Sequence, residues 1–120
     1  MSYEDFTKMP VWQTGFQLVL DIYKMTKTFP ADERFGLTSD TRRSANSIVH
    51  NIAEGFGRYD AKDKTRFYKI SRGSVYELMS QILVSHGLTY INAKTRDNLM
   101  VHCKKIIGEL NAIIRTLEKG

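Results

Sequence analysis

The chain has 120 residues, of which 42% are hydrophobic and 26% charged, which excludes a disordered or collagen-like chain and predicts one domain over residues 1–120. It contains no run of about 18 apolar residues that would predict a membrane span. Its first residues are acidic and include no apolar stretch, so we expect no secretory signal. The single cysteine, Cys103, excludes an internal disulfide, so we expect a protein of the reducing cytoplasm.

Prolines and glycines bound the first two predicted helices. The first covers about residues 11–28, between Pro10, which a first helical turn tolerates, and Pro30. The second begins after Gly36, with Thr38 expected as its N-cap, and ends near Gly57. Apolar residues of the first helix form two rows, one of Trp12, Phe16, Val19, Leu20 and Tyr23, and one of Val11, Leu18, Ile22 and Met25.

The third and fourth predicted helices begin at Asp60 and at Asn92 or Thr95. The expected core row of the third helix is Phe67, Ile70, Ser74, Leu78 and Ile82, and its second row is Tyr68, Val75, Met79 and Leu83. The fourth helix has the alternating spacing of left-handed helix packing, at Leu99, Cys103, Ile106, Leu110, Ile113 and Leu117. Short loops make neighbouring helices antiparallel, so the sequence predicts an all-α, antiparallel up-and-down four-helix bundle.

Two features of these helices call for a further explanation. A bundle of this size needs one buried stripe per helix, so we expect other subunits to cover the second rows, including Tyr68, Val75, Met79 and Leu83. Glycines also interrupt helix interiors at positions 15, 73 and 108, each at a cost of about 1 kcal/mol relative to alanine. We expect close helix crossings at Gly15, Gly73 and Gly108, and room for a ligand is the alternative.

An ordered set of motifs carries a resemblance to a known family. It comprises Glu33-Arg34-Phe35-Gly36-Leu37-Thr38, Arg42-Arg43, Ser47-Ile48, Asn51-Ile52-Ala53-Glu54-Gly55-Phe56-Gly57-Arg58, Gly73-Ser74 and Glu77-Leu78. This set closely resembles the bacterial four-helix-bundle proteins encoded by intervening sequences of 23S rRNA genes, over roughly residues 6–118. The resemblance implies a homopentamer with a central channel. It also implies kinship with accessory proteins of diversity-generating retroelements, which bind a reverse transcriptase and nucleic acid; the family is often labelled ribosomal-protein-like.

Positive charge concentrates in residues 42–72, where eight Lys and Arg stand against three Asp and Glu. Lys62, Arg66, Lys69 and Arg72 recur at i, i+4, i+7 and i+10, which places four cations along one side of the third helix. Such a row can follow nucleic-acid phosphates and release counterions. With Arg42, Arg43 and Arg58 these residues are the candidate nucleic-acid contacts. The alternative is a solvated face with salt bridges to Asp60 and Asp63.

Polar residues beside the apolar rows predict a structural network. Its expected members are Arg43, Asn51, Glu54, Ser74 and Glu77, which would fix the helix register or a subunit interface. Glu54 and Glu77 could instead form a general acid/base pair, but no nucleophile or phosphate loop accompanies them, so no catalytic residues are expected. The Glu-x-x-His motif of di-iron bundles is missing and the three histidines are isolated, so we expect no metal or cofactor.

Cysteine and tyrosine give little indication of a functional site. Cys103 lies in the apolar row of the fourth helix and is expected to be a small buried hydrophobe. The tyrosines at positions 23, 59, 68, 76 and 90 are scattered, which gives little support to an aromatic stacking platform.

Together these observations predict a non-enzymatic, cytoplasmic homo-oligomer that binds RNA or DNA. Since no helix-turn-helix, RNP or zinc-finger motif is present, binding is expected to be directed at the backbone and weakly sequence-specific. The alternative function is a protein-interaction scaffold whose positive surface meets an acidic protein partner.

Overall fold

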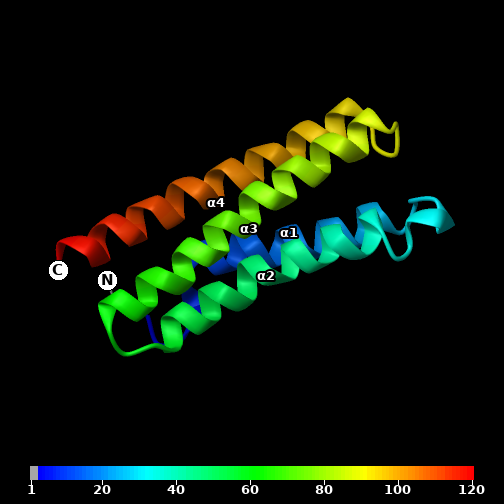
Figure 1. The fold of residues 1–120 in the computed structure, drawn as a ribbon. Coiled ribbons are helices and arrows are strands. Elements are labelled where there is room, and N and C mark those ends of the chain that lie inside the picture. Colours follow the sequence, from blue (N-terminus) through cyan, green and yellow to red (C-terminus); the bar gives the residue numbers. More distant parts are fainter. Residues whose placement is uncertain (1–2) are drawn as a thin grey trace.

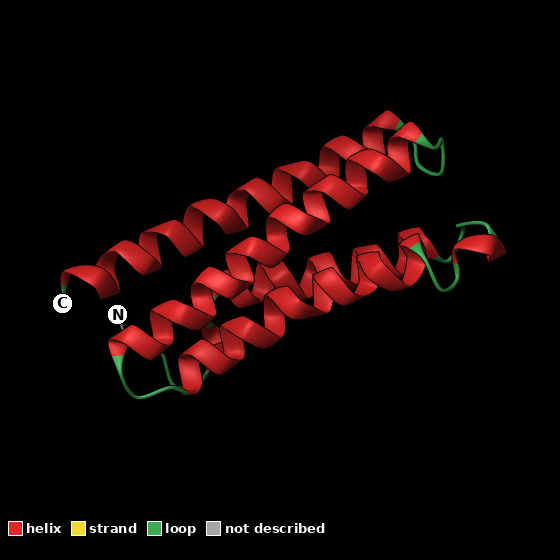
Figure 2. Ribbon diagram, viewed as in Figure 1, coloured by secondary structure: helices red, strands yellow, loops and turns green. Residues whose placement is uncertain are grey.

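The computed structural model describes residues 3–120 and shows four long helices in an up-and-down bundle (Figure 1). The helices are α1 (Pro10–Thr26), α2 (Leu37–Gly57), α3 (Ala61–Gly87) and α4 (Ala93–Lys119), with short 3-10 turns at Phe6–Lys8 and Ala31–Glu33. The described part of the chain contains no strand (Figure 2), and none of its helices is both long and apolar enough to cross a bilayer. The predicted all-α four-helix bundle is confirmed.

The two ends of the bundle carry different connections (Figure 1). Both chain ends and the α2–α3 loop lie at one end, whereas the α1–α2 and α3–α4 connections lie at the other. α3 packs extensively against both α2 and α4, while the seam between α1 and α4 is the sparsest. The α1–α2 hairpin and the α3–α4 hairpin are therefore held together mainly by the packing of α3 against α2.

Glu33 supplies the cap at the start of α2. The backbone N–H of Leu37 donates to Glu33 Oε1 at 3.1 Å, and the hydroxyl of Tyr90 donates to Glu33 Oε2 at 2.9 Å. A Cβ atom at Gly36, the N-cap residue, would lie 2.9 Å from Glu33 Oε1, so glycine lets the carboxylate come this close. The prediction of Thr38 as N-cap is wrong, because Thr38 already lies inside α2.

The apolar stripe of α3 differs from the predicted one. Ile70 is exposed and Phe67 is only partly buried, whereas Tyr68, Ser71 and Val75 are buried with Leu78 and Ile82. Ser71 faces the core because its hydroxyl donates to the carbonyl oxygen of Ile48 at 2.8 Å, which satisfies the polar group without water. The predicted row of Phe67, Ile70 and Ser74 is therefore wrong, and so is the expectation that other subunits cover Tyr68 and Val75.

Cys103 lies fully buried in the core on α4. Burial raises the pKa of its thiol to about 12, because the apolar surroundings disfavour the thiolate. The prediction that Cys103 acts as a small buried hydrophobe is confirmed, and its thiol has no part in any site described below.

Among the residues that the structure describes, only one of the three predicted close crossings is present. A Cβ at Gly15 would lie 2.9 Å from Val49 Cγ1, so α1 and α2 do cross closely there. At Gly73 and Gly108 a Cβ would meet no atom within 4 Å, so that prediction is wrong for these two positions. A different glycine is sterically required, because a Cβ at Gly55 would lie 2.7 Å from Cε1 of the buried Tyr68.

Alanine at Gly55 and at Gly73 should change stability in opposite directions. Gly73→Ala is expected to stabilise the protein by up to about 1 kcal/mol, because helix propensity rises and no contact opposes the methyl group. Gly55→Ala is expected to destabilise it by about 1–2 kcal/mol, because displacing Tyr68 outweighs the gain in propensity. Urea unfolding followed by circular dichroism measures both. A stabilised Gly55→Ala variant would contradict the tight contact with Tyr68.

Candidate nucleic-acid interface

Three members of the predicted cationic row line an open groove at the end of the bundle that holds both chain ends. The groove lies between the first turns of α3 and the last turns of α4 and has a volume of about 910 Å³. Its charged and large apolar lining residues are Lys62, Arg66, Lys69, Asp63, Glu118, Ile70 and Leu117. The helical spacing therefore does bring these three cations to one surface. We call this surface the α3 groove.

The cations of the row differ in their partners. Lys69 Nζ lies 2.8 Å from Glu118 Oε2, Arg66 Nη2 lies 3.9 Å from Asp63 Oδ1, and Arg72 Nη1 donates to Asn111 Oδ1 at 2.8 Å. Within residues 3–120, Lys62 has neither an ion pair nor a hydrogen bond to its side chain. The Lys69 and Arg66 pairs are about half exposed, and such pairs are worth at most about 1 kcal/mol, so a phosphate could replace either carboxylate.

Two arginines share one aromatic ring at the start of α3. The guanidinium carbons of Arg58 and Arg66 lie 4.5 Å and 4.4 Å from the ring centroid of Phe67. Arg58 Nη2 also lies 3.1 Å from Glu54 Oε2. Cation–π contacts of this kind hold long side chains in place. Helical periodicity predicts Phe67 in the core and therefore gives no sign of its role as a support for both arginines.

Arg42 and Arg43 lie apart from the α3 groove, near the start of α2 and toward the other end of the bundle (Figure 1). Arg42 faces α1, where Nε donates to Thr26 Oγ1 at 2.7 Å and the guanidinium carbon lies 4.6 Å from the ring centroid of Tyr23. Arg43 Nη2 lies 3.7 Å from both Asp40 Oδ1 and Glu77 Oε2. The seven candidate residues therefore do not form a single surface.

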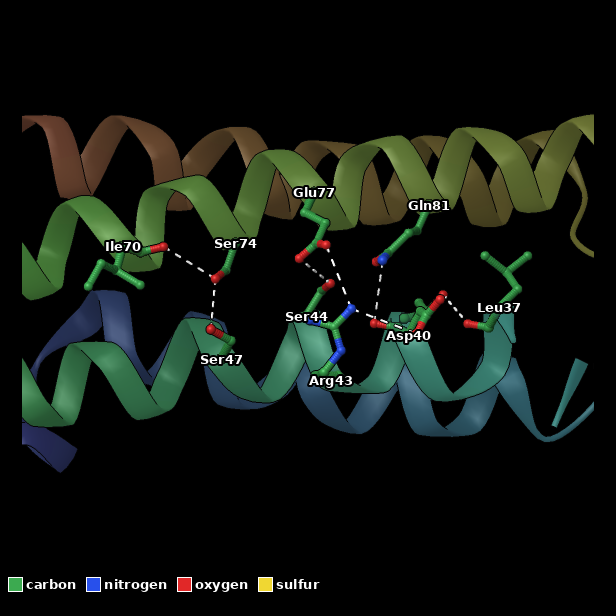
Figure 3. A network of polar contacts seen from close by, with 10 residues as sticks. Leu37, Asp40, Arg43, Ser44, Ser47, Ile70, Ser74, Glu77 and Gln81 are labelled. Atoms are coloured by element: carbon green, nitrogen blue, oxygen red, sulfur yellow. Dashed lines mark hydrogen bonds and ion pairs between the residues drawn. The ribbon is translucent and has the colours of Figure 1, made fainter. Parts of the chain in front are cut away.

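The seam between α2 and α3 carries a polar network (Figure 3). Ser44 Oγ donates to Glu77 Oε1 at 2.9 Å beside Arg43, and one turn along the hydroxyls of Ser47 and Ser74 lie 2.7 Å apart. Asn51 Nδ2 extends this second pair by donating to the Ser47 carbonyl oxygen at 2.8 Å. Four predicted members thus lie along the seam in two groups. Ser44 joins the first group and Ser47 the second, and neither serine was among the expected members.

Glu54 and Glu77 are held by different groups. Glu54 pairs with Arg58, whereas Glu77 pairs with Arg43 and Ser44. The two carboxylates therefore share no partner among residues 3–120. Among residues 3–120, His, Cys, Asp and Glu side chains nowhere gather in threes as ligands for a metal ion.

One flank of α1 presents apolar side chains to solvent. Phe16, Leu20 and Tyr23 are 45%, 47% and 37% exposed, and Trp12 stacks on Phe16 with ring centroids 5.1 Å apart. These residues belong to one of the two predicted rows of this helix, while the other row faces the core. We call Phe16, Leu20 and Tyr23 the α1 flank.

Comparison with protein families identifies the chain. The family model described as 23S rRNA-intervening sequence protein matches residues 7–112. Comparison with curated proteins gives no match. The matched range contains every motif on which the resemblance rested, from Glu33 to Leu78. The chain therefore belongs to the 23S rRNA-intervening sequence protein family.

Proposed function

We propose that this protein is a non-enzymatic, homo-oligomeric helical bundle of the cytoplasm that binds RNA or DNA through phosphate contacts along α3. The observation that carries the proposal is the α3 groove, where Lys62, Arg66 and Lys69 lie in a row. Lys62 has no partner within residues 3–120. The other two form exposed ion pairs that a phosphate can displace, and Arg66 also rests on the Phe67 ring.

The chemistry of the groove favours the nucleic-acid backbone as its ligand. Side chains at i, i+4 and i+7 of a helix follow one another at about 5–6 Å between Cβ atoms, which suits a row of phosphates. Phosphate contacts position a nucleic acid without reading its bases. The proposed binding is therefore strongly dependent on salt and weakly dependent on sequence.

The oligomer belongs to the same proposal. The α1 flank exposes three large apolar side chains on one helix, a surface that a neighbouring subunit would cover. The resemblance of the sequence to its family gives the number of subunits as five. In a closed ring each subunit repeats the α3 groove, which multiplies the local positive potential.

A salt titration tests the nucleic-acid part of the proposal. Binding of the full chain to unrelated RNA and DNA is measured by fluorescence anisotropy between about 0.05 and 0.2 M salt. We expect log affinity to fall linearly with log salt, by similar amounts for different sequences. Absence of binding at the lowest salt would contradict the proposal and would favour an acidic protein as the partner of this surface.

A further inference from the structure

We infer that Tyr59, in the loop between α2 and α3, is a stacking residue for an unpaired base, so that the ligand of the α3 groove is single-stranded nucleic acid. This inference rests on the proposed function, and it specifies the class of ligand that the same surface takes. The exposure of Tyr59 in the structure suggests this role. The position of Tyr59 in the sequence does not.

Tyr59 presents its ring to solvent. The residue is 88% exposed, and its hydroxyl makes no hydrogen bond within the part of the chain that the structure describes. An aromatic ring placed in water gains nothing for the folded chain, so the ring is free to pack on a ligand. Every base presents a flat π-face, and stacking on an exposed aromatic is the usual way in which proteins hold unpaired bases.

The loop that carries Tyr59 is short and held at both ends. It consists of residues 58–60. The Arg58 N–H donates to the Gly55 carbonyl oxygen at 3.3 Å, and the Lys64 N–H donates to the Asp60 carbonyl oxygen at 2.9 Å. Lys64 Nζ also donates to the Phe56 carbonyl oxygen at 2.7 Å, which fastens the end of α2 to α3. Little conformational freedom is lost when a ligand packs on a residue displayed in this way.

Cations adjoin Tyr59 on both sides. Arg58, the preceding residue, borders a shallow depression with His50 and Glu54, while Lys62, three residues later, borders the α3 groove. The guanidinium groups of Arg58 and Arg66 rest on the same Phe67 ring, so these two cations lie close to each other. A strand that crosses this loop can place one base on Tyr59 and the flanking phosphates against these cations.

Duplex nucleic acid does not suit this arrangement. Its bases are stacked on one another and paired, so a projecting side chain meets the sugar–phosphate backbone and not a base face. Loss of the tyrosine ring should therefore weaken binding of single strands and leave binding of duplexes unchanged. This difference separates base stacking from a general contribution of Tyr59 to the surface.

The test compares Tyr59→Ala and Tyr59→Phe with the parent protein. Anisotropy is measured with a labelled uridine oligonucleotide of about 12 nucleotides and with an RNA duplex of the same length. Tyr59→Ala is expected to lower the affinity for the single strand by between about 5-fold and about 150-fold. Tyr59→Phe should retain the parent affinity, and the salt slope of Tyr59→Ala should match that of the parent, because the phosphate contacts remain.

Phe35 provides a matched control. It is 87% exposed, lies next to Arg34, whose guanidinium carbon is 5.2 Å from its ring centroid, and belongs to the α1–α2 connection at the other end of the bundle. Phe35→Ala should leave the affinity for both ligands unchanged, and light scattering should give every variant the parent mass. Equal loss of single-strand and duplex affinity in Tyr59→Ala would overturn the inference.

The remaining outcomes separate the inference from the proposed function. Parent-like single-strand binding by Tyr59→Ala, with the steep salt dependence intact, would overturn the stacking role and leave phosphate binding by the α3 groove standing. A parent protein that binds neither ligand at low salt would overturn both.

Discussion

Replacing Phe16 and Leu20 together with glutamate is expected to reduce the protein to the mass of a single chain. Both side chains are nearly half exposed, so the substitutions remove little from the core of the subunit. In an assembly that covers the α1 flank, the same substitutions would bury two unpaired carboxylates, which is far more costly than burying apolar side chains. Light scattering at micromolar concentration should give the parent several times 13.8 kDa and the variant about one chain mass.

A matched control introduces the same charge on another helix. Asn98 and Ala112 are exposed on α4, on the side away from its buried row, so changing both to glutamate should leave the assembly at the parent mass. A parent protein that scatters as a monomer would contradict the oligomer, and a Phe16/Leu20 variant that keeps the parent mass would show that subunits meet elsewhere. In the latter case the exposed Leu83 and Val84 of α3 become the surface to test.

Much of the fold could be predicted from apolar residues that recur at the spacing of a helix. α4 matches its predicted row at Leu99, Cys103, Ile106 and Leu110, because apolar residues at these spacings have a single favourable face. α3 departs from its prediction, because the pattern of apolar residues places Ile70 in the core and gives no sign that Ser71 is buried there. Ser71 is buried, since its hydroxyl donates to a backbone carbonyl of α2.

The candidate site could be predicted only in part. The spacing of Lys62, Arg66 and Lys69 within one helix correctly predicts that they lie along one surface. The pair of Arg66 with Asp63 is one of the salt bridges that the sequence offers as the alternative. The partners of Lys69 and Arg72 could not be predicted, because Glu118 and Asn111 approach α3 from residues far along the chain. Arg42 shows the same limit, since a run of two arginines gives no sign that the first would pack on Tyr23 of α1.

Changing Lys62, Arg66 and Lys69 together to glutamine should weaken nucleic-acid binding without disturbing the fold. Glutamine is a comparable helix former, and the removal of like charges at i, i+4 slightly favours the helix. Without these three cations to neutralise phosphates, the affinity should fall about 100-fold at about 0.1 M salt. The matched control changes Lys94, Lys104 and Lys105, which are exposed on α4, so it removes equal charge but should largely preserve binding.

The salt slope of this triple variant tests most directly the claim that α3 binds phosphates. The proposal predicts that the slope of log affinity against log salt flattens by about 0.7–0.9 for each phosphate that the variant no longer neutralises, or about 2–3 in all for one subunit. The flattening should be the same for unrelated sequences, because lysine and arginine that bind phosphates read no bases. A variant that binds as tightly as the parent, with the same slope, would contradict the role of α3 and direct attention to Arg42, Arg43 and α4.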